Sequence, residues 1–257
     1  MKTGPQRRAP HIDLDDVIYG IHAVNEALAA GEALKHIHVG DDRKRDPALR
    51  PLLDHAREAA IPVRFENRGY FAAFPYKVHQ SVVAFGEPFA YITLEEAIAL
   101  RPAGRPGLWV VLDHVTDPHN VGAIIRTAEC VGVTAMILPE RRSAGVNATV
   151  RKAAAGAAAY LPVARVSNVA QSVRVLKKAG IWVAAAALGP NAVGYTAADF
   201  NRDLAIVIGA EGEGVSPLVQ RECDYLVAIP LEGKVASLNA SVAAGVLFYE
   251  ALRQRAG

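Results

Sequence analysis

Hydrogen-bonding side chains are concentrated in residues 113–127, DHVTDPHNVGAIIRT, directly after the apolar run GLWVVL. A connecting turn needs little more than a glycine or a proline, whereas this one holds two aspartates, two histidines, a threonine and Asn120. Asn120 would make a good N-cap, because its side-chain oxygen can accept a backbone N–H from the first helical turn. Arg126 follows among small helix neighbours, where a guanidinium needs an anionic or carbonyl partner. The pattern indicates a binding site, unless Arg126 only forms a surface ion pair with Glu129.

A second polar loop, residues 209–217 (GAEGEGVSP), follows another apolar run, LAIVI. Glycines, beginning with Gly209, surround Glu211 and Glu213 in it. The loop lacks the Lys-Ser/Thr pair of a phosphate-binding P-loop, and its acids would repel phosphate. We therefore expect a tight loop that offers backbone amides and one carboxylate to a neutral or cationic ligand. A plain turn before a helix at 216–223 is the alternative.

A third polar segment, residues 230–245 (PLEGKVASLNASVAAG), opens the last predicted helix. Ser237, Asn239 and Ser241 crowd its first turn, although a helix start requires only one capping side chain. The small residues that follow allow close helix packing. A helix start that is both polar and sterically open favours a ligand site.

The elements that must position these three segments begin near residue 107. Apolar runs of this kind, continuous and not alternating, suit strands that are covered on both faces. The predicted strands are 108–113, 134–139, 161–166, 181–188, 204–209 and 225–230. The predicted helices are 121–132, 148–159, 168–179 and 239–254. This alternation predicts a doubly wound, mostly parallel α/β domain over 107–257, in which ligands bind beyond the carboxyl ends of the strands.

A smaller α/β pattern precedes this domain, over residues 16–86. One helix is predicted over 16–31, ending at Gly31, and another over 46–61, with Asp46 as its N-cap. The predicted strands are 34–40, 62–67 and 79–86. Residues 87–106 are rich in proline and predict a linker around a short helical patch at 93–100. Residues 1–15 are predicted to form a basic flexible arm, or simply a frayed end.

The composition is that of a globular protein: 51% of the 257 residues are hydrophobic and 21% are charged. A formal charge of +2 permits a nucleic-acid partner without requiring one. Cys130 and Cys223 lack the spacing of a metal or redox pair, so we expect reduced, buried thiols and no metal site. No apolar run reaches the roughly 18 residues that would span a bilayer, and no signal peptide is evident. No membrane association and a cytoplasmic location are the resulting expectations.

The three polar segments together resemble the signature motifs of the SpoU-type RNA 2′-O-methyltransferases of the SPOUT superfamily. The likeness covers residues 107–257 and rests on DPHNVGAIIRTAE, IVIGAEGEGVS and IPLEGKVASLNASVAAGVLFYE. In the first domain, YGIHAVNEAL and HQSVVA resemble the substrate-binding domain of the 23S ribosomal RNA guanosine-2′-O-methyltransferases. The resemblance implies S-adenosylmethionine as methyl donor, 23S ribosomal RNA as substrate and a trefoil knot in the catalytic domain. It also implies a homodimer in which each site is completed across the interface.

The resemblance nominates catalytic residues position by position. Asn120 and Arg126 match the first motif, Glu211 matches the acid of the second, and Ser237 and Asn239 match the polar pair of the third. The positions that hold the cofactor, largely through backbone groups, are Gly209, Ile229 and Leu238. Because arginine stays protonated in proteins, we expect Arg126 to act as an electrostatic clamp on RNA phosphate and developing alkoxide. The hydroxyl proton would then leave to water or to Glu211.

Two positions depart from the family pattern. Ser81 stands where the family's HQG element has glycine, and Ala154 stands where a serine is common. The first bears on RNA handling, and neither touches the methyl-transfer motifs.

Other functions stay open at this stage. A non-catalytic RNA-binding or ribosome-assembly protein would be expected to lack Arg126, Asn120 or Asn239, all of which are present. The same chemistry could act on transfer RNA or on a resistance-conferring ribosomal site. A nucleotide-binding oxidoreductase is disfavoured, because no G-x-G-x-x-G follows the first strand of the large domain.

Overall fold

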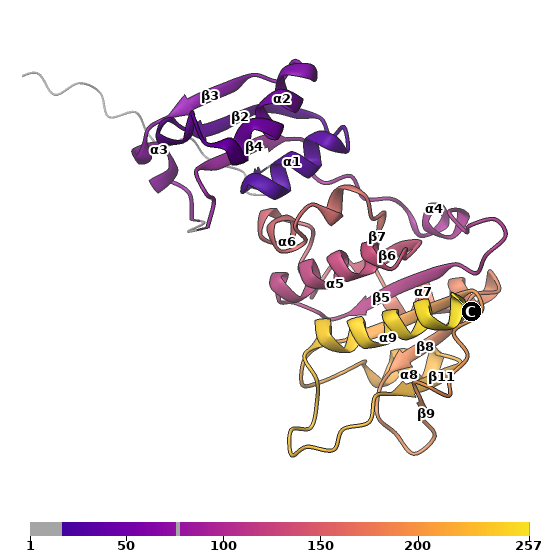
Figure 1. Ribbon diagram of the computed structural model, residues 1–257. Helices are drawn as coiled ribbons and strands as arrows, with labels where there is room; N and C mark the ends of the chain where they lie inside the picture. The colour runs from indigo at the N-terminus through magenta and orange to yellow at the C-terminus, as the bar shows by residue number, and fades with distance from the viewer. Residues whose placement is uncertain (1–16, 76–77, 257) are drawn as a thin grey trace, which may run out of the picture. The chain divides into compact units, whose positions relative to one another are not determined.

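Two separately packed units make up the chain, and the division falls after Phe89. The structure is a computed structural model that describes residues 17–75 and 78–256, and Figure 1 shows its elements. The arm predicted over residues 1–15 lies outside the described residues. Among the described residues, no helix combines the length and the apolar character needed to cross a membrane.

A four-stranded sheet forms the centre of the N-terminal unit. Its strands are β1 (Val17–Tyr19), β2 (Leu34–Gly40), β3 (Val63–Glu66) and β4 (Val82–Gly86). They are ordered β1-β4-β2-β3, with β4 antiparallel to both β1 and β2, and β3 parallel to β2. On one face, α1 (Ile21–Ala29) and α2 (Arg50–Glu58) enclose an aliphatic core that includes Ile37 and Val39 of β2. The short elements of this unit are η2 (Asp41–Arg43), η3 (Pro47–Leu49) and α3 (Arg68–Ala72).

Helix starts in this unit differ in part from the sequence-based predictions. The prediction of one helix over 16–31 is wrong at its beginning, because Val17–Tyr19 pair with β4 as a strand. Gly20, with a φ of 90°, then turns the chain into α1. Asp46 does act as a cap: its carboxylate accepts the Ala48 N–H at 2.9 Å. It caps the single turn η3, which leads into α2.

The other side of β2 carries histidines packed with aromatic rings, named here the histidine cluster: His36, His38, Tyr70 and Phe85. His38 is only 3% exposed and stacks on Tyr70 with ring centroids 4.6 Å apart. Its Nδ1 lies 3.1 Å from Oε1 of Glu66. His36 stacks on Phe85 at 4.8 Å. Burial is the largest cause that lowers the pKa of His38, and it also lowers the pKa of His36. Neutral rings are therefore favoured in this cluster.

A seven-stranded, wholly parallel sheet forms the C-terminal unit, with the strand order β7-β6-β5-β10-β8-β11-β9. The strands are β5 (Leu108–Asp113), β6 (Ala135–Pro139), β7 (Val163–Val166), β8 (Trp182–Ala186), β9 (Val193–Gly194), β10 (Leu204–Gly209) and β11 (Tyr225–Ala228). Every residue of β5, β6 and β10 is buried. This arrangement confirms the predicted doubly wound parallel domain and its small α/β companion. The trefoil knot stays a prediction.

Helices cover both faces of this sheet, as continuous apolar strands require. One face packs against α4 (Leu94–Ala99), α7 (Val169–Lys178) and α8 (Pro217–Glu222). On the other side, α5 (Pro118–Cys130) packs against α6 (Ala148–Ala153) and α9 (Ala240–Arg255), and α9 contacts β10. Figure 1 shows α5 and α9 side by side. A single turn, η4 (Ala157–Ala159), follows α6 and also contacts α5.

The segment 87–106, expected to be a linker, packs into the C-terminal unit except for its first three residues. Ile92 bridges to Ala164 of β7, and the Trp109 indole N–H donates to the Ala97 carbonyl at 2.8 Å. The apolar residues of the helical patch thus find a core, which the surrounding prolines had obscured in the sequence.

Arg255 bonds the end of the last helix to the chain that leads into the seven-stranded sheet. Its Nε donates to the Phe200 carbonyl at 2.9 Å, and its terminal nitrogens donate to the carbonyls of Pro106 at 3.2 Å and Gly107 at 3.1 Å. These bonds join the end of α9 to the segment that leads into β5. The opposite end of the same helix reaches the candidate site.

Candidate active site

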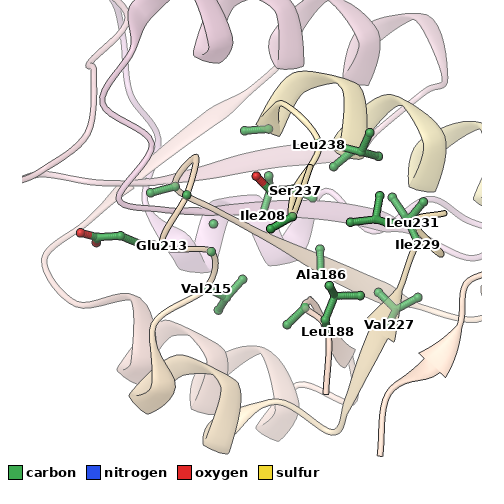
Figure 2. Close-up of a pocket in the computed structure, with 18 of the residues that line it drawn as sticks. Ala186, Leu188, Ile208, Glu213, Val215, Val227, Ile229, Leu231, Ser237 and Leu238 are labelled. Carbon is green, nitrogen blue, oxygen red and sulfur yellow. The ribbon is translucent and has the colours of Figure 1, made fainter. Parts of the chain in front are cut away.

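An apolar cavity of about 300 Å³ lies at the carboxyl ends of β10, β8 and β11. Gly209, Ile229, Leu238 and Ser237, all nominated from the sequence, line it. Its apolar walls include Ala186, Leu188, Ile208, Val215, Val227 and Leu231 (Figure 2). Glu213 lies at the opposite end of the cavity from Ile229 in the same view. None of the described residues that line the cavity carries a cationic side chain.

Three polar side chains from the three sequence segments meet through hydrogen bonds, and we call them the polar triad: Asn120, Glu211 and Asn239. Nδ2 of Asn239 donates to Oδ1 of Asn120 at 2.9 Å and to Oε2 of Glu211 at 3.3 Å. Nδ2 of Asn120 donates to the same Glu211 oxygen at 3.3 Å. Asn120 is 7% exposed, whereas Glu211 is exposed. The triad therefore has a buried side and a side open to a substrate.

Different residues cap the two helices that carry the asparagines. The expectation that Asn120 is an N-cap is wrong, because α5 begins at Pro118 and Asp117 accepts the His119 N–H at 2.8 Å. The side chain of Asn120 is thereby free for the triad. Asn239 is the N-cap of α9, since its Oδ1 accepts the Ser241 N–H at 2.9 Å. Its amide nitrogen still reaches the triad, so one side chain serves both purposes.

The loop that carries Glu211 is closed tightly on itself. Gly214 N donates to the Ala210 carbonyl at 2.8 Å, which forms a short bridge. A Cβ added to Gly209 would lie 2.0 Å from the backbone carbon of Gly214, so no larger residue fits there. Gly212 and Gly214 have φ values of 85° and 70°, which favour glycine. The glycines thus shape the loop that holds Glu211 beside the cavity.

A buried carboxylate ties this loop to the first polar segment. Asp113, the last residue of β5, is 1% exposed, and its Oδ2 accepts the Ser216 N–H at 2.7 Å. Its Oδ1 lies 2.8 Å from Nδ1 of His114 but is not aligned for a hydrogen bond. His114 has a φ of 62°, a left-handed conformation that costs energy for a residue other than glycine. The turn after β5 therefore has a strained backbone at His114, and the hydrogen bond from Ser216 to Asp113 holds it in place.

Arg126 stands apart from the triad. It lies on the exposed face of α5 and makes no hydrogen bond or ion pair, with Glu129 or otherwise, within the described residues. The surface ion pair considered as an alternative is therefore not formed here. Cys130, one turn further, is exposed, so the prediction that it is buried is wrong. Cys223 is half-buried, and burial raises the pKa of its thiol to about 12.

Two parts of the cavity wall were not predicted from the sequence. The carboxyl end of β8, at Ala186–Leu188, and Gln220 of α8 both line it. The segment Ala186–Leu188 also lies at the end of an apolar run, and this position was the signal that could have identified it. The segment carries no polar side chain, so it was not singled out. Gln220 lies in a helix whose role could not be separated from plain packing. Its Nε2 donates to the Val215 carbonyl at 2.6 Å and so supports the cavity wall.

A parallel, doubly wound domain with an apolar cavity and a polar triad at its carboxyl edge has the architecture of a cofactor-binding α/β enzyme. Within the described residues, no group of three or more His, Cys, Asp or Glu side chains is arranged to hold a metal ion. Residues 107–249 match the SpoU rRNA Methylase family, and residues 17–92 match a domain described as RNA 2′-O ribose methyltransferase substrate binding. The chain belongs to the SpoU rRNA methylase family and is an RNA methyltransferase.

Curated relatives share both units. A putative TrmH family tRNA/rRNA methyltransferase of Staphylococcus haemolyticus is 39% identical over 243 residues, which cover 94% of this chain and 96% of the relative. An uncharacterized tRNA/rRNA methyltransferase of Synechocystis is 40% identical over 243 residues. That match covers 93% of this chain but 63% of the relative, so the chain spans less than two thirds of that relative's length.

Solved structures have the same arrangement. The SpoU methyltransferase AviRb of Streptomyces viridochromogenes, in complex with the cofactor AdoMet, is 26% identical with a TM-score of 0.79. The match covers 94% of this chain and 90% of that one. An AdoMet-bound rRNA methyltransferase of Sinorhizobium meliloti is 27% identical with a TM-score of 0.76, over 92% of this chain and 86% of that one.

Proposed function

We propose that this protein transfers a methyl group from S-adenosylmethionine to the ribose 2′-hydroxyl of a guanosine in 23S ribosomal RNA. The observation that carries the proposal is the polar triad, which draws Asn120, Glu211 and Asn239 together beside the apolar cavity. Glu211 lies 91 positions after Asn120 in the sequence, and Asn239 lies 119 positions after it. A protein that only binds RNA would not require these three side chains to meet.

The cavity suits the proposed cofactor. When bound, S-adenosylmethionine supplies an electrophilic methyl group on a cationic sulfur. Apolar walls and the absence of a cationic side chain among the described lining residues favour such a molecule, because a nearby guanidinium or ammonium would repel the sulfonium. Gly209, Ile229 and Leu238 would hold it largely through backbone groups, and the carboxylate of Glu213 adds a favourable charge. A cavity of about 300 Å³ lies at the lower end of the range for small-molecule sites.

The triad would hold the reacting ribose. Positioning a hydroxyl against an electrophile supplies a large share of the acceleration in such reactions. Oε2 of Glu211 already accepts two amide N–H bonds, which leaves Oε1 to accept the 2′-hydroxyl proton. Ser237, at the cavity wall, would complete the ring of polar contacts. Arg126 would clamp the nucleotide's phosphate and stabilise the developing alkoxide.

A homodimer is part of this proposal. The exposed side of α9 presents Val242, Tyr249 and Leu252, which are 52%, 56% and 39% exposed. Apolar side chains gathered on one helix favour contact with another protein surface. The adjacent helix α5 carries Arg126 and Cys130, both exposed, so a partner on this face would lie next to the proposed clamp. Sedimentation of a monomer at micromolar concentration would contradict the dimer.

Mapping of ribose methylation tests the proposed function directly. Ribosomal and transfer RNA from cells with and without this protein are compared, and one guanosine of 23S RNA is expected to lose its 2′-O-methyl group. Purified protein should restore that methyl group in the presence of S-adenosylmethionine and a metal chelator. Loss of a mark only in transfer RNA would reassign the substrate, and an unchanged map would favour a non-catalytic RNA-binding role.

A further inference from the structure

Two adjacent arginines, Arg141 and Arg142, are exposed on the loop 140–147 that follows β6. Neither makes a hydrogen bond, ion pair or ring contact with any of the residues that the structure describes. Of the seven other exposed arginines in the described part of this unit, four are paired: Arg101, Arg165, Arg174 and Arg253. Arg141 and Arg142 differ from the remaining three, Arg105, Arg126 and Arg221, in being adjacent in sequence. The two cations are thus available to an anion from outside the chain.

The loop that carries them is held in place, although its arginines are unpaired. Ser143 Oγ and Ala144 N both donate to the Val115 carbonyl, at 3.2 Å and 3.1 Å. Val146 N donates to the Tyr91 hydroxyl at 2.7 Å. The chain therefore anchors the backbone that follows the two arginines and leaves both cations without a neutralising partner. Uncompensated cations on an anchored loop are better suited to binding an anion than to stabilising the fold.

Arg142 also has a φ of 57°, in the left-handed region. This conformation is energetically unfavourable for a residue other than glycine. Glycine would avoid that cost at this position. Backbone strain at an unpaired arginine is consistent with a side chain that serves an external ligand.

Topology places the loop next to the proposed methylation site. In the sheet, β5 lies between β6 and β10, and all three strands are parallel, so the loops that follow them share one edge. Val115, which anchors the arginine loop, belongs to the turn that leads from β5 to Asn120. The cavity lies on the far side, at β10, β8 and β11. A polynucleotide whose ribose meets the triad can therefore continue over β6.

We infer that Arg141 and Arg142 bind phosphates of the RNA chain next to the methylated nucleotide. The inference rests on the proposed function, because it takes RNA as the occupant of the triad. Guanidinium groups bind phosphate oxygens in a bidentate manner, and backbone phosphates fix the register of a nucleic acid without reading its sequence. The arginine pair thus sets where the RNA strand lies, while the triad and cavity perform the transfer.

Charge-removing variants of the full chain test this assignment. Arg141→Gln and Arg142→Gln should each weaken binding of a 23S RNA fragment by roughly three- to tenfold. Each should also lower the slope of log affinity against log salt by about one, as expected for the loss of one phosphate contact. Lys178→Gln, an exposed cation at the end of α7, is the matched control and should change neither quantity. The double Arg→Lys variant should recover most of the salt slope.

Kinetics separate this role from a structural one. For both Gln variants, KM for RNA should rise while the single-turnover rate at saturating RNA and the affinity for S-adenosylmethionine stay within twofold of wild type. Unchanged RNA affinity and salt slope in both variants would overturn the inference. Equal losses in Lys178→Gln would also overturn it, because the effect would then be one of net charge. If wild-type protein methylates no ribosomal RNA, the proposed function itself fails, which is a distinct result.

Discussion

A single unpaired cation on α5 carries the sharpest prediction at the scale of residues. Arg126 is exposed and has no hydrogen-bonding partner among the described residues, and it does not line the cavity. Arg126→Ala should therefore leave the affinity for S-adenosylmethionine within a few-fold of wild type. Methyl transfer should fall by on the order of a hundredfold, because the negative charge that develops on the ribose oxygen and the adjacent phosphate loses the cation proposed to stabilise it. Arg126→Lys should recover little, because a point charge cannot replace a planar fork.

Cofactor titration and single-turnover methylation on the same Arg126 variant provide the measurement. A collapse of cofactor affinity with normal turnover at saturating cofactor would place Arg126 in the cofactor site instead. Arg174→Ala, which removes an exposed arginine on α7, is a suitable control for loss of charge.

Gly209 gives a second residue-scale prediction. Gly209→Ala would place a methyl group 2.0 Å from the backbone of Gly214, so the loop must move. Because Gly209 lines the cavity and the loop carries Glu211, cofactor affinity should fall at least tenfold, with a loss of roughly 1–3 kcal/mol in stability from overpacking. Gly194→Ala, where nothing lies within 4 Å, is the matched control. Isothermal titration and thermal unfolding measure both effects, and a Gly209→Ala variant that binds like wild type would contradict this account.

The residues of the site could be nominated from sequence, but their contacts could not. Local spacing placed Asn120, Glu211 and Asn239 after separate apolar runs, and strand order alone decides whether such segments meet. The false expectation of an Asn120 N-cap shows the limit of local rules. Asp117, which is followed by proline, is an equally good N-cap for α5. The hydrogen bonds of the triad explain why Asn120 does not serve as the cap.

Among the elements, the histidine cluster beside β2 should respond to pH. The folded-state pKa of His38 and of His36 is lowered, first of all by burial. The unfolded chain therefore binds more protons just below the ordinary histidine pKa of about 6.5. Stability contributed by the cluster is fully present above that pH and is lost as the pH falls toward the folded-state pKa values.

Denaturant unfolding at pH 7.5 and pH 5.5 measures this dependence. The N-terminal unit should be less stable at the lower pH, and His38→Phe, which keeps a stacking ring, should flatten the change. His22→Gln, at an exposed position of α1, should leave it as in wild type. An unaltered pH dependence in His38→Phe would show that the cluster does not titrate in this range.

Element prediction succeeded where apolar runs were long and failed where elements were short. The buried strands β5, β6 and β10 are continuous hydrophobic runs of five or six residues, a length and composition typical of strands covered on both faces. By contrast, β1 has three residues and β9 two, too few for any period to show. Tertiary pairing with β4, not local preference, makes a strand of Val17–Tyr19.

For the molecule as a whole, we expect the N-terminal unit to supply RNA affinity and the C-terminal unit to bind the cofactor and perform methyl transfer. The C-terminal unit has its own core, the cavity and the triad, whereas residues 17–92 match a substrate-binding domain. A chain of residues 90–257 should bind S-adenosylmethionine within a few-fold of the full protein. It should lose most methylation of 23S RNA, because RNA affinity would depend on the unit that has been removed. Equal methylation of the same nucleotide by both chains would contradict the division.

The boundary between the units illustrates what a single sequence leaves undetermined. Prolines and glycines over 87–106 indicated a linker. The helical patch α4 nevertheless packs on the sheet, and its Ala97 carbonyl accepts a hydrogen bond from the indole N–H of Trp109. Composition describes how a segment behaves alone. Whether a neighbouring core has room for it depends on side chains far away in the chain.

The helix fastened by Arg255 has a consequence for when the enzyme can first work. Asn239 opens α9, and the far end of that helix is anchored to the carbonyls before β5. During synthesis, more than a hundred residues separate the emergence of Asn120 from that of Asn239. The polar triad therefore forms only once α9 has been synthesised and has packed against α5, so the candidate site is completed late in the folding of the C-terminal unit.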